Sequence, residues 1–175
     1  MYIYIMRHGE AANIEGEDSQ RPLTKKGVVE AEQMGFWLAQ CKLTRLLKIF
    51  VSPYVRAQQS CNNVMSAFNK SAKLSGINSE TLDLITPSGN VKHVHDFIDG
   101  LCHELEFSQH NTCDEKEAIL FVSHMPFVSY LVGELTDSTN MPIFSTGAIA
   151  VIDYDIVKMQ GKLVDIVLPE NTGIL

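Results

Sequence analysis

The chain has 175 residues, of which 45% are hydrophobic and 20% charged, as expected for one soluble globular domain spanning residues 1–175. Its formal net charge of −7 argues against a nucleic-acid partner, because binding to a phosphate backbone needs a basic face. No apolar run approaches the ~20 residues that a membrane-spanning helix needs, so no membrane partner is expected either.

The first half of the chain has the pattern of strands alternating with helices. Tyr2–Met6 is predicted to be a short buried strand, and a polar loop leads from it to a helix over Thr24–Gln40. Lys48–Val51 follows as a second strand. Pro53 then opens a second helix, which is expected to end near Lys70.

The second half continues the alternation and ends in two strands with no helix between them. The expected elements are a weak strand at Glu80–Leu84, a helix over Ser88–Glu106, a strand at Ala118–Val122, a helix over Pro126–Leu135, and strands at Gly147–Tyr154 and Leu163–Leu168. The alternation indicates a mainly parallel sheet with helices on both faces, and the last pair predicts an antiparallel edge. The predicted fold class is therefore α/β, a three-layer α/β/α sandwich.

The cysteines and the first residues of the chain indicate the compartment. The four cysteines show no C-x-x-C spacing: Cys41, Cys61, Cys102 and Cys113. Thiols in a reducing compartment fit this pattern better than a disulfide or zinc framework. The first apolar stretch also leaves no room for a signal peptide, so we expect a cytoplasmic protein.

Arginine is used sparingly in this chain. Of the fourteen basic residues only four are arginine, namely Arg7, Arg21, Arg45 and Arg56. Arginine holds a phosphate through a planar two-pronged fork, whereas lysine acts as a point charge. Such selective placement in an acidic protein suggests a small anion site on an otherwise anionic surface.

Three predicted strands run directly into residues suited to bind an anion. The first runs into Arg7-His8-Gly9, the second into Ser52-Pro53 with Arg56 close behind, and the strand at Ala118–Val122 into Ser123-His124. Ligands in open α/β sheets bind at the carboxyl ends of the strands, where helix N-termini also offer free N–H groups. The side chains expected to converge at this edge are Arg7, His8, Arg56 and His124.

These residue types suit phosphoryl transfer. A neutral imidazole can attack phosphorus through one nitrogen while its other N–H is held, so His8 is the candidate nucleophile. Arg7, Arg56 and His124 can bind the equatorial oxygens, with Arg21 reaching the same phosphate from the side. The Ser52 hydroxyl either caps the following helix or contacts the phosphate. Water would then hydrolyse a phosphohistidine intermediate, with no metal or cofactor required.

The motifs resemble those of the histidine phosphatase superfamily. The matching segments are Met6-Arg7-His8-Gly9-Glu10-Ala11, Arg21-Pro22-Leu23-Thr24, Val51-Ser52-Pro53-Tyr54-Val55-Arg56-Ala57 and Val122-Ser123-His124-Met125-Pro126. Two further segments, Leu84–Gly89 and Phe144–Ala150, resemble the SixA-type phosphohistidine phosphatases in particular. The resemblance implies a phosphoglycerate mutase-like fold, His8 as nucleophile and a pocket that includes Arg21. It also implies a phosphohistidine-containing protein as the substrate.

One departure from the superfamily concerns the proton donor. Many members place a carboxylic acid after the second arginine segment, where this chain has Leu82-Asp83-Leu84-Ile85-Thr86-Pro87. Asp18, in the loop before Arg21, is the better-placed candidate proton donor. An alkoxide leaving group needs a proton, whereas an imidazole whose ring is protonated leaves readily. The lack of a clear carboxylic acid in this segment therefore favours phosphohistidine over phosphate esters as the substrate.

Other histidines suggest a metal site only at first sight. His93 and His95 project about 160° apart on the expected helix, and His103 lies ~15 Å from His93 along the axis, so the three cannot share an ion with Asp96. His110 is expected in a surface loop. Two alternatives to a phosphohistidine phosphatase stay open: a phosphatase of small phosphorylated metabolites, and a catalytically weak phospho-binding module. The oligomeric state is also open, and a monomer is compatible with the sequence.

Overall fold

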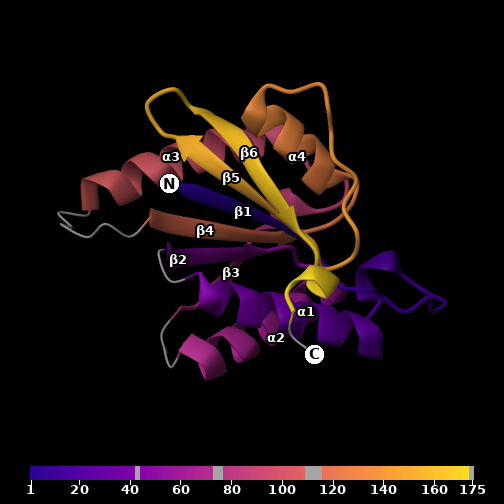
Figure 1. Ribbon diagram of the computed structural model, residues 1–175. Coiled ribbons are helices and arrows are strands. Elements are labelled where there is room, and N and C mark those ends of the chain that lie inside the picture. The colour runs from indigo at the N-terminus through magenta and orange to yellow at the C-terminus, as the bar shows by residue number, and fades with distance from the viewer. Residues whose placement is uncertain (42–43, 73–76, 109–115, 174–175) are drawn as a thin grey trace.

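Six strands form one mixed sheet in the computed structural model, which describes residues 1–41, 44–72, 77–108 and 116–173 (Figure 1). The strands are β1 (Tyr2–Arg7), β2 (Thr44–Val51), β3 (Ser79–Thr81), β4 (Lys116–Ser123), β5 (Ile149–Asp155) and β6 (Gln160–Val167). Their order across the sheet is β3-β2-β4-β1-β5-β6. β1 to β4 are parallel, whereas β5 runs antiparallel to both β1 and β6. The predicted mainly parallel sheet with an antiparallel edge is confirmed.

Helices cover both faces of this sheet (Figure 1). They are α1 (Lys25–Gln40), α2 (Val55–Ala72), α3 (Val91–Ser108) and α4 (Phe127–Thr136). Alternate side chains of β1 point to opposite faces: Tyr4 and Met6 pack with α1 and α2, and Ile3 and Ile5 with α3 and α4. All four are at most 3% exposed, so each face of β1 lies in a separate hydrophobic core. The three-layer sandwich follows from this alternation.

The weak strand expected at Glu80–Leu84 is shorter than predicted. Strand β3 ends at Thr81, and Asp83–Ile85 forms a 3₁₀ turn. Ile85 is fully buried in the core beneath α3 and α4, and the chain leaves the sheet edge to place it there. In the opposite sense, β2 begins earlier than predicted, because it pairs with β4 from Thr44 onward.

The carboxyl ends of β1, β2 and β4 meet at one edge of the sheet. Arg7 is the register partner of Ser123, and Val51 is the partner of Val122. Just beyond these pairs, the His8 N–H donates to the Ser123 carbonyl at 2.9 Å, and the Ser52 N–H donates to the Val122 carbonyl at 3.0 Å. The parallel register therefore carries the motif residues of three strands to the same place.

Candidate active site

Two glycines fix the loop that presents His8. A Cβ atom on Gly9 would come 2.3 Å from the Gly27 carbonyl oxygen, so α1 can approach this loop only where the side chain is absent. Gly147 has a φ of +74°, and its N–H donates to the His8 carbonyl at 3.1 Å. The Gly9 N–H donates to the Ser60 hydroxyl at 3.0 Å. The backbone on both sides of the His8 side chain is thus held from separate elements.

The His8 ring is held in one tautomer. Its Nδ1 lies 2.6 Å from the Gly9 carbonyl oxygen, which can only accept, so the proton is on Nδ1. The lone pair of Nε2 then faces Arg56, whose Nε–H donates to it at 3.1 Å. Burial lowers the pKa of His8 to about 4, and the nearby arginines add to the effect against the opposing Gly9 bond. The ring is therefore neutral at pH 7, and the Nε2 electron pair becomes available to a ligand when the Arg56 bond is released.

His124 lies beside His8 with a ring nitrogen that has no partner. The two ring centroids are 5.0 Å apart, and the His124 side chain is fully buried. Its Nε2 lies 2.7 Å from the Ser52 hydroxyl, while its Nδ1 makes no hydrogen bond to any described residue. Burial, followed by the charges of His8 and Arg56, lowers the pKa of His124 to about 3.

Arg7 also has a buried nitrogen without a partner. Its Nη1 donates to the Phe144 carbonyl at 2.6 Å, but its Nε makes no hydrogen bond within the described chain. Buried polar groups are almost always hydrogen-bonded in folded proteins. Two unpartnered nitrogens, on Arg7 and His124, therefore mark a place where a ligand with acceptor oxygens would complete the structure.

The pocket has a volume of about 390 Å³, and three of the four arginines of the chain line it. Arg7, Arg21 and Arg56 line it together with His8, and Pro87 and Met125 form an apolar part of its wall. Three guanidinium groups around a neutral imidazole can stabilise the negative charge of a phosphoryl group. The predicted convergence of strand-end residues is what the structure shows, and Arg21 joins them.

Asp18 forms hydrogen bonds with two arginines of the pocket. Its carboxylate accepts from Arg56 Nη2 at 2.8 Å and from Arg21 Nη1 at 3.0 Å. The hydrogen bond from Arg56, followed by that from Arg21, holds the pKa of Asp18 below its ordinary value. Asp18 is therefore ionised at neutral pH, which disfavours the predicted role of proton donor. Its carboxylate is instead a partner of the Arg56 and Arg21 guanidinium groups.

Comparison with known proteins assigns the family. The model of the histidine phosphatase superfamily (branch 1) matches residues 3–77. Phosphohistidine phosphatase SixA of Escherichia coli is 36% identical over 155 residues, which cover 89% of this chain and 86% of that protein. The chain belongs to the histidine phosphatase superfamily.

Two further relatives agree with this membership. A SixA homolog of Haemophilus influenzae is 35% identical over 159 residues, 89% of each chain. The solved structure of the protein histidine phosphatase SixA complexed with tungstate has a TM-score of 0.83 and 34% identity, covering 98% of this chain and 99% of that one. The resemblance drawn from the motifs, including that to the SixA type, is confirmed over nearly the whole chain.

Ser52 has a different neighbour from the one predicted. Its fully buried hydroxyl neither lines the pocket nor caps α2 through a helical N–H, but contacts His124 and accepts the Tyr54 N–H at 3.5 Å. The other partner of the hydroxyl, the Tyr54 N–H, can only donate, so among the described residues His124 Nε2 is the acceptor available to the Ser52 proton. Ser52 is thus placed to orient the His124 ring.

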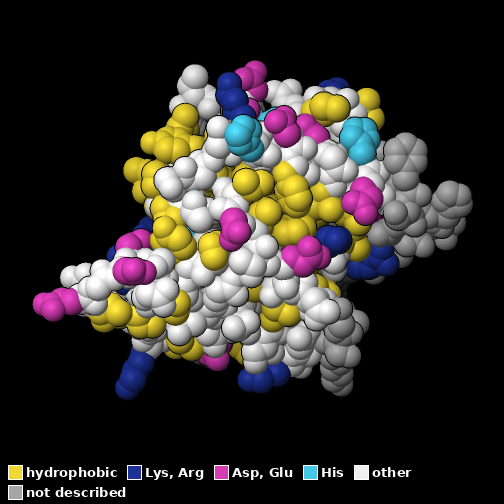
Figure 2. Space-filling model, turned by 180° about the vertical axis from the view of Figure 1, so that it is seen from behind, with side chains coloured by type: hydrophobic (Ala, Val, Ile, Leu, Met, Phe, Trp, Pro, Cys, Tyr) yellow, Lys and Arg dark blue, Asp and Glu magenta, His cyan; other side chains and the backbone are white. Residues whose placement is uncertain are grey.

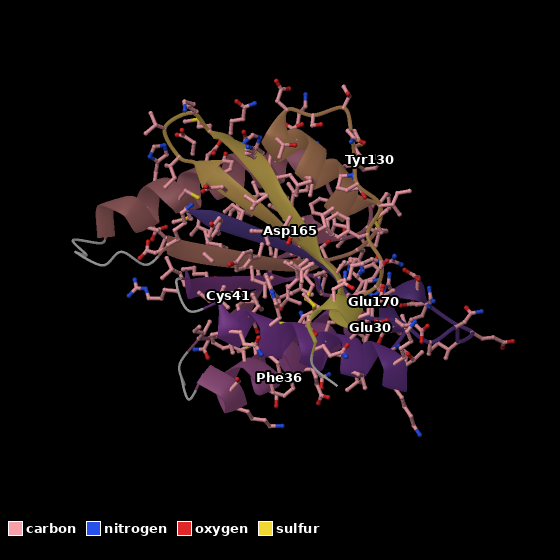
Figure 3. The ribbon with its side chains drawn as sticks, in the orientation of Figure 1. Glu30, Phe36, Cys41, Tyr130, Asp165 and Glu170 are labelled. Atoms are coloured by element: carbon pink, nitrogen blue, oxygen red, sulfur yellow. The ribbon has the colours of Figure 1, made fainter. Side chains whose placement is uncertain are left out.

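Glu30 is a residue of this superfamily member that the motifs did not single out. This carboxylate on α1 is buried; it accepts the Glu10 N–H at 2.8 Å and the Thr146 hydroxyl at 2.8 Å. It lines a hollow together with Glu170 of the C-terminal 3₁₀ turn; both residues are labelled in Figure 3. The helical spacing could have indicated that Glu30 is buried, because it lies four residues before Met34 and eight before Leu38, which are both buried on α1. Glu30 ties the loop after His8 to the segment before β5.

The remaining histidines and cysteines lie elsewhere. His95 contacts the Tyr154 hydroxyl at 2.8 Å and Glu134 at 3.5 Å, and His93 is exposed. No group of three or more metal-ligating side chains occurs among the described residues. Cys41, Cys61 and Cys102 are free thiols, while His110 and Cys113 lie outside the described residues. None of the described helices has the length and hydropathy to span a bilayer.

Proposed function

We propose that this chain is a metal-independent phosphatase that hydrolyses phosphohistidine on a signalling or phosphotransfer protein in the cytoplasm. The observation that carries the proposal is the tautomer of His8, whose Nδ1–H is held by Gly9 and whose Nε2 lone pair faces the arginines. A neutral imidazole with a fixed lone pair is a nucleophile at pH 7. The names of the two curated relatives support phosphohistidine as the substrate.

In the first step, Nε2 of His8 forms a bond to the phosphorus atom as the substrate P–N bond breaks. The electron pair of that bond stays on the leaving nitrogen. A proton on the other nitrogen of the substrate ring makes the leaving group a neutral imidazole. Arg56 exchanges Asp18 for phosphoryl oxygens, and Arg7 Nε and His124 Nδ1 acquire the partners they lack.

In the second step, water attacks the phosphorus and the P–Nε2 bond breaks, releasing inorganic phosphate. The electron pair returns to Nε2, and a proton of the water leaves with the phosphate or solvent. His8 kept its Nδ1–H throughout, so it leaves as a neutral imidazole. The Gly9 bond that prepares the nucleophile therefore also prepares the leaving group.

The carboxylates of the pocket favour a phosphorus–nitrogen bond over an ester. Only Glu10 and Asp18 line it with carboxyl groups among the described residues. A hydrogen bond from Thr24 lowers the pKa of Glu10, and one from Arg56 lowers that of Asp18. Neither holds a proton at neutral pH to give to an alkoxide. An imidazole leaving group needs no such donor.

The test is a comparison of substrates with the purified protein. A phosphohistidine-carrying protein should turn over faster than every member of a panel of phosphate esters, and EDTA should leave the rate unchanged. Faster turnover of small esters would indicate a metabolite phosphatase instead. Tight binding of the phosphoprotein without release of phosphate would indicate a phospho-binding module. Loss of activity in EDTA would contradict the metal-independent chemistry.

A further inference from the structure

A group of apolar side chains is exposed near the mouth of the pocket. Tyr130 on α4 is 49% exposed, Met141 45% and Ile143 88%; we call these three residues the apolar rim. Tyr130 and Met141 share a shallow hollow of about 380 Å³, and Tyr130 lies at the outer side of α4 (Figure 3). Clustered exposed apolar residues mark interaction sites more often than isolated ones do.

Hydrogen bonds link the segment that carries the apolar rim to residues of the phosphate pocket. Ser129 bonds the Pro142 carbonyl, between Met141 and Ile143, and also contacts Met125 Sδ at 3.1 Å. Met125 lines the pocket itself. One residue beyond Ile143, the Phe144 carbonyl accepts from Arg7. The segment that carries the apolar rim therefore ends on the arginine that faces the phosphate.

The loop on the other side of the pocket is acidic. Asp18 and Arg21 of this loop line the pocket, and Glu15 and Glu17 extend beyond it as exposed residues. Neither glutamate has a cationic partner among the described residues. Figure 2 shows acidic side chains projecting at this edge, next to the hydrophobic ones over α4 and the segment after it. The pocket mouth thus has an apolar side and a negatively charged side.

We propose that this mouth docks the substrate protein, with an apolar surface beside its phosphohistidine on the apolar rim and basic side chains against Glu15 and Glu17. This inference rests on the proposed function, because only a macromolecular substrate reaches residues outside the pocket. Positive charge near the phosphohistidine would complement both the two glutamates and the net charge of −7. A small phosphorylated metabolite would touch neither side.

The experiment compares two substrates with the same phosphorus–nitrogen bond. One is a small phosphocarrier protein phosphorylated on its histidine with phosphoramidate, and the other is free N-phosphohistidine. Ile143→Ser, alone and with Met141→Ser, should lower kcat/KM on the phosphoprotein about tenfold, mainly through KM, because truncated interface residues cost about that much. The same variants should keep kcat/KM on free phosphohistidine within about twofold.

A matched control is available at the opposite end of the sheet. Val157 is 85% exposed in the turn after β5, which pairs antiparallel with β1 and so ends away from His8. Val157→Ser should change neither rate. Glu15→Gln with Glu17→Gln should weaken the salt dependence of KM on the phosphoprotein alone, because screening then acts on fewer interfacial charges.

Three results would overturn the docking surface. They are unchanged kcat/KM on the phosphoprotein in the rim variants, an equal loss on both substrates, and a wild-type dimer that Ile143→Ser converts to monomer. A dimer that Ile143→Ser converts to monomer would show that the apolar rim binds a second copy of this chain. Failure of the wild-type protein on both phosphohistidine substrates would instead contradict the proposed function, so the two failures are distinguishable.

Discussion

The Ser52 hydroxyl lies 2.7 Å from Nε2 of His124, and this bond sets the tautomer of the His124 ring. Donation from Ser52 places the ring proton on Nδ1, the buried nitrogen without a partner. We expect Ser52→Ala to lower kcat/KM on phosphohistidine by ~10-fold, since orienting partners of site histidines have effects of that size. Ser52→Thr, which keeps the hydroxyl, should restore most of the activity. Equal rates for Ser52→Ala and wild type would contradict this role.

Asp18→Asn tests whether the Asp18 carboxylate competes with phosphate for the arginines or acts as a proton donor. The Asp18 carboxylate accepts from Arg56 and Arg21, so we expect it to compete with phosphate for these two side chains. Removing its charge should lower the inhibition constant of inorganic phosphate about threefold to tenfold, as a loss of ~1 kcal/mol of competition would. The value of kcat on phosphohistidine should stay within about twofold. A large fall in kcat would indicate that Asp18 is a proton donor.

The buried neutral histidines predict how stability depends on pH. The pKa of His8 is lowered to about 4 and that of His124 to about 3, against 6.5 in the unfolded chain. Between pH 6.5 and 4 the unfolded state therefore binds more protons, and the free energy of unfolding falls as the pH falls. Each histidine should lower the free energy of unfolding by about 2 kcal/mol as the pH falls from 7 to 5.

The measurement is urea unfolding of wild type and His124→Asn at both pH values. The wild type should lose more free energy of unfolding on acidification than the variant does. A wild-type free energy that is independent of pH over this range would mean that these rings are not held neutral.

Gly9→Ala tests the close approach of the nucleophile loop to α1. The new Cβ would lie 2.3 Å from the Gly27 carbonyl oxygen, which is backbone and cannot turn aside. We expect a loss of about 1–3 kcal/mol in the free energy of unfolding, as for other overpacked sites. Gly100→Ala, within α3, is the matched control, because no described atom apart from its chain neighbours and the nearby backbone of its own helix lies within 4 Å of the corresponding Cβ. Equal stability of the two variants would contradict the packing argument.

The convergence of His8 with the arginines could be predicted from the sequence because these features are local. Arg7 ends β1, Arg56 lies in the first turn of the helix after β2, and His124 follows β4. Parallel strands end at the same edge of a sheet. Long-range contacts were beyond such reasoning. Thr146 and Glu30 are 116 positions apart, and their bond follows from the packing of α1 against the segment before β5.

Two predicted residues show the same limit. Ser52 was correctly assigned to a strand end, but the choice between phosphate, helix N–H and His124 depends on where another strand places its histidine. Asp18 was placed near the pocket, yet its charge state depends on two arginines that approach it from different elements. Local sequence indicates which side chains reach an edge, while their pairings depend on the folded arrangement.

The central claim is that His8 itself carries the phosphoryl group during turnover. The direct measurement is rapid acid-free quenching of the enzyme with a phosphoprotein substrate labelled in its phosphorus, followed by peptide mapping. The account predicts transient label on His8, at Nε2, that decays as inorganic phosphate appears and that His8→Ala does not form. Phosphate release at the normal rate by His8→Ala, or label on another residue of the enzyme, would contradict it.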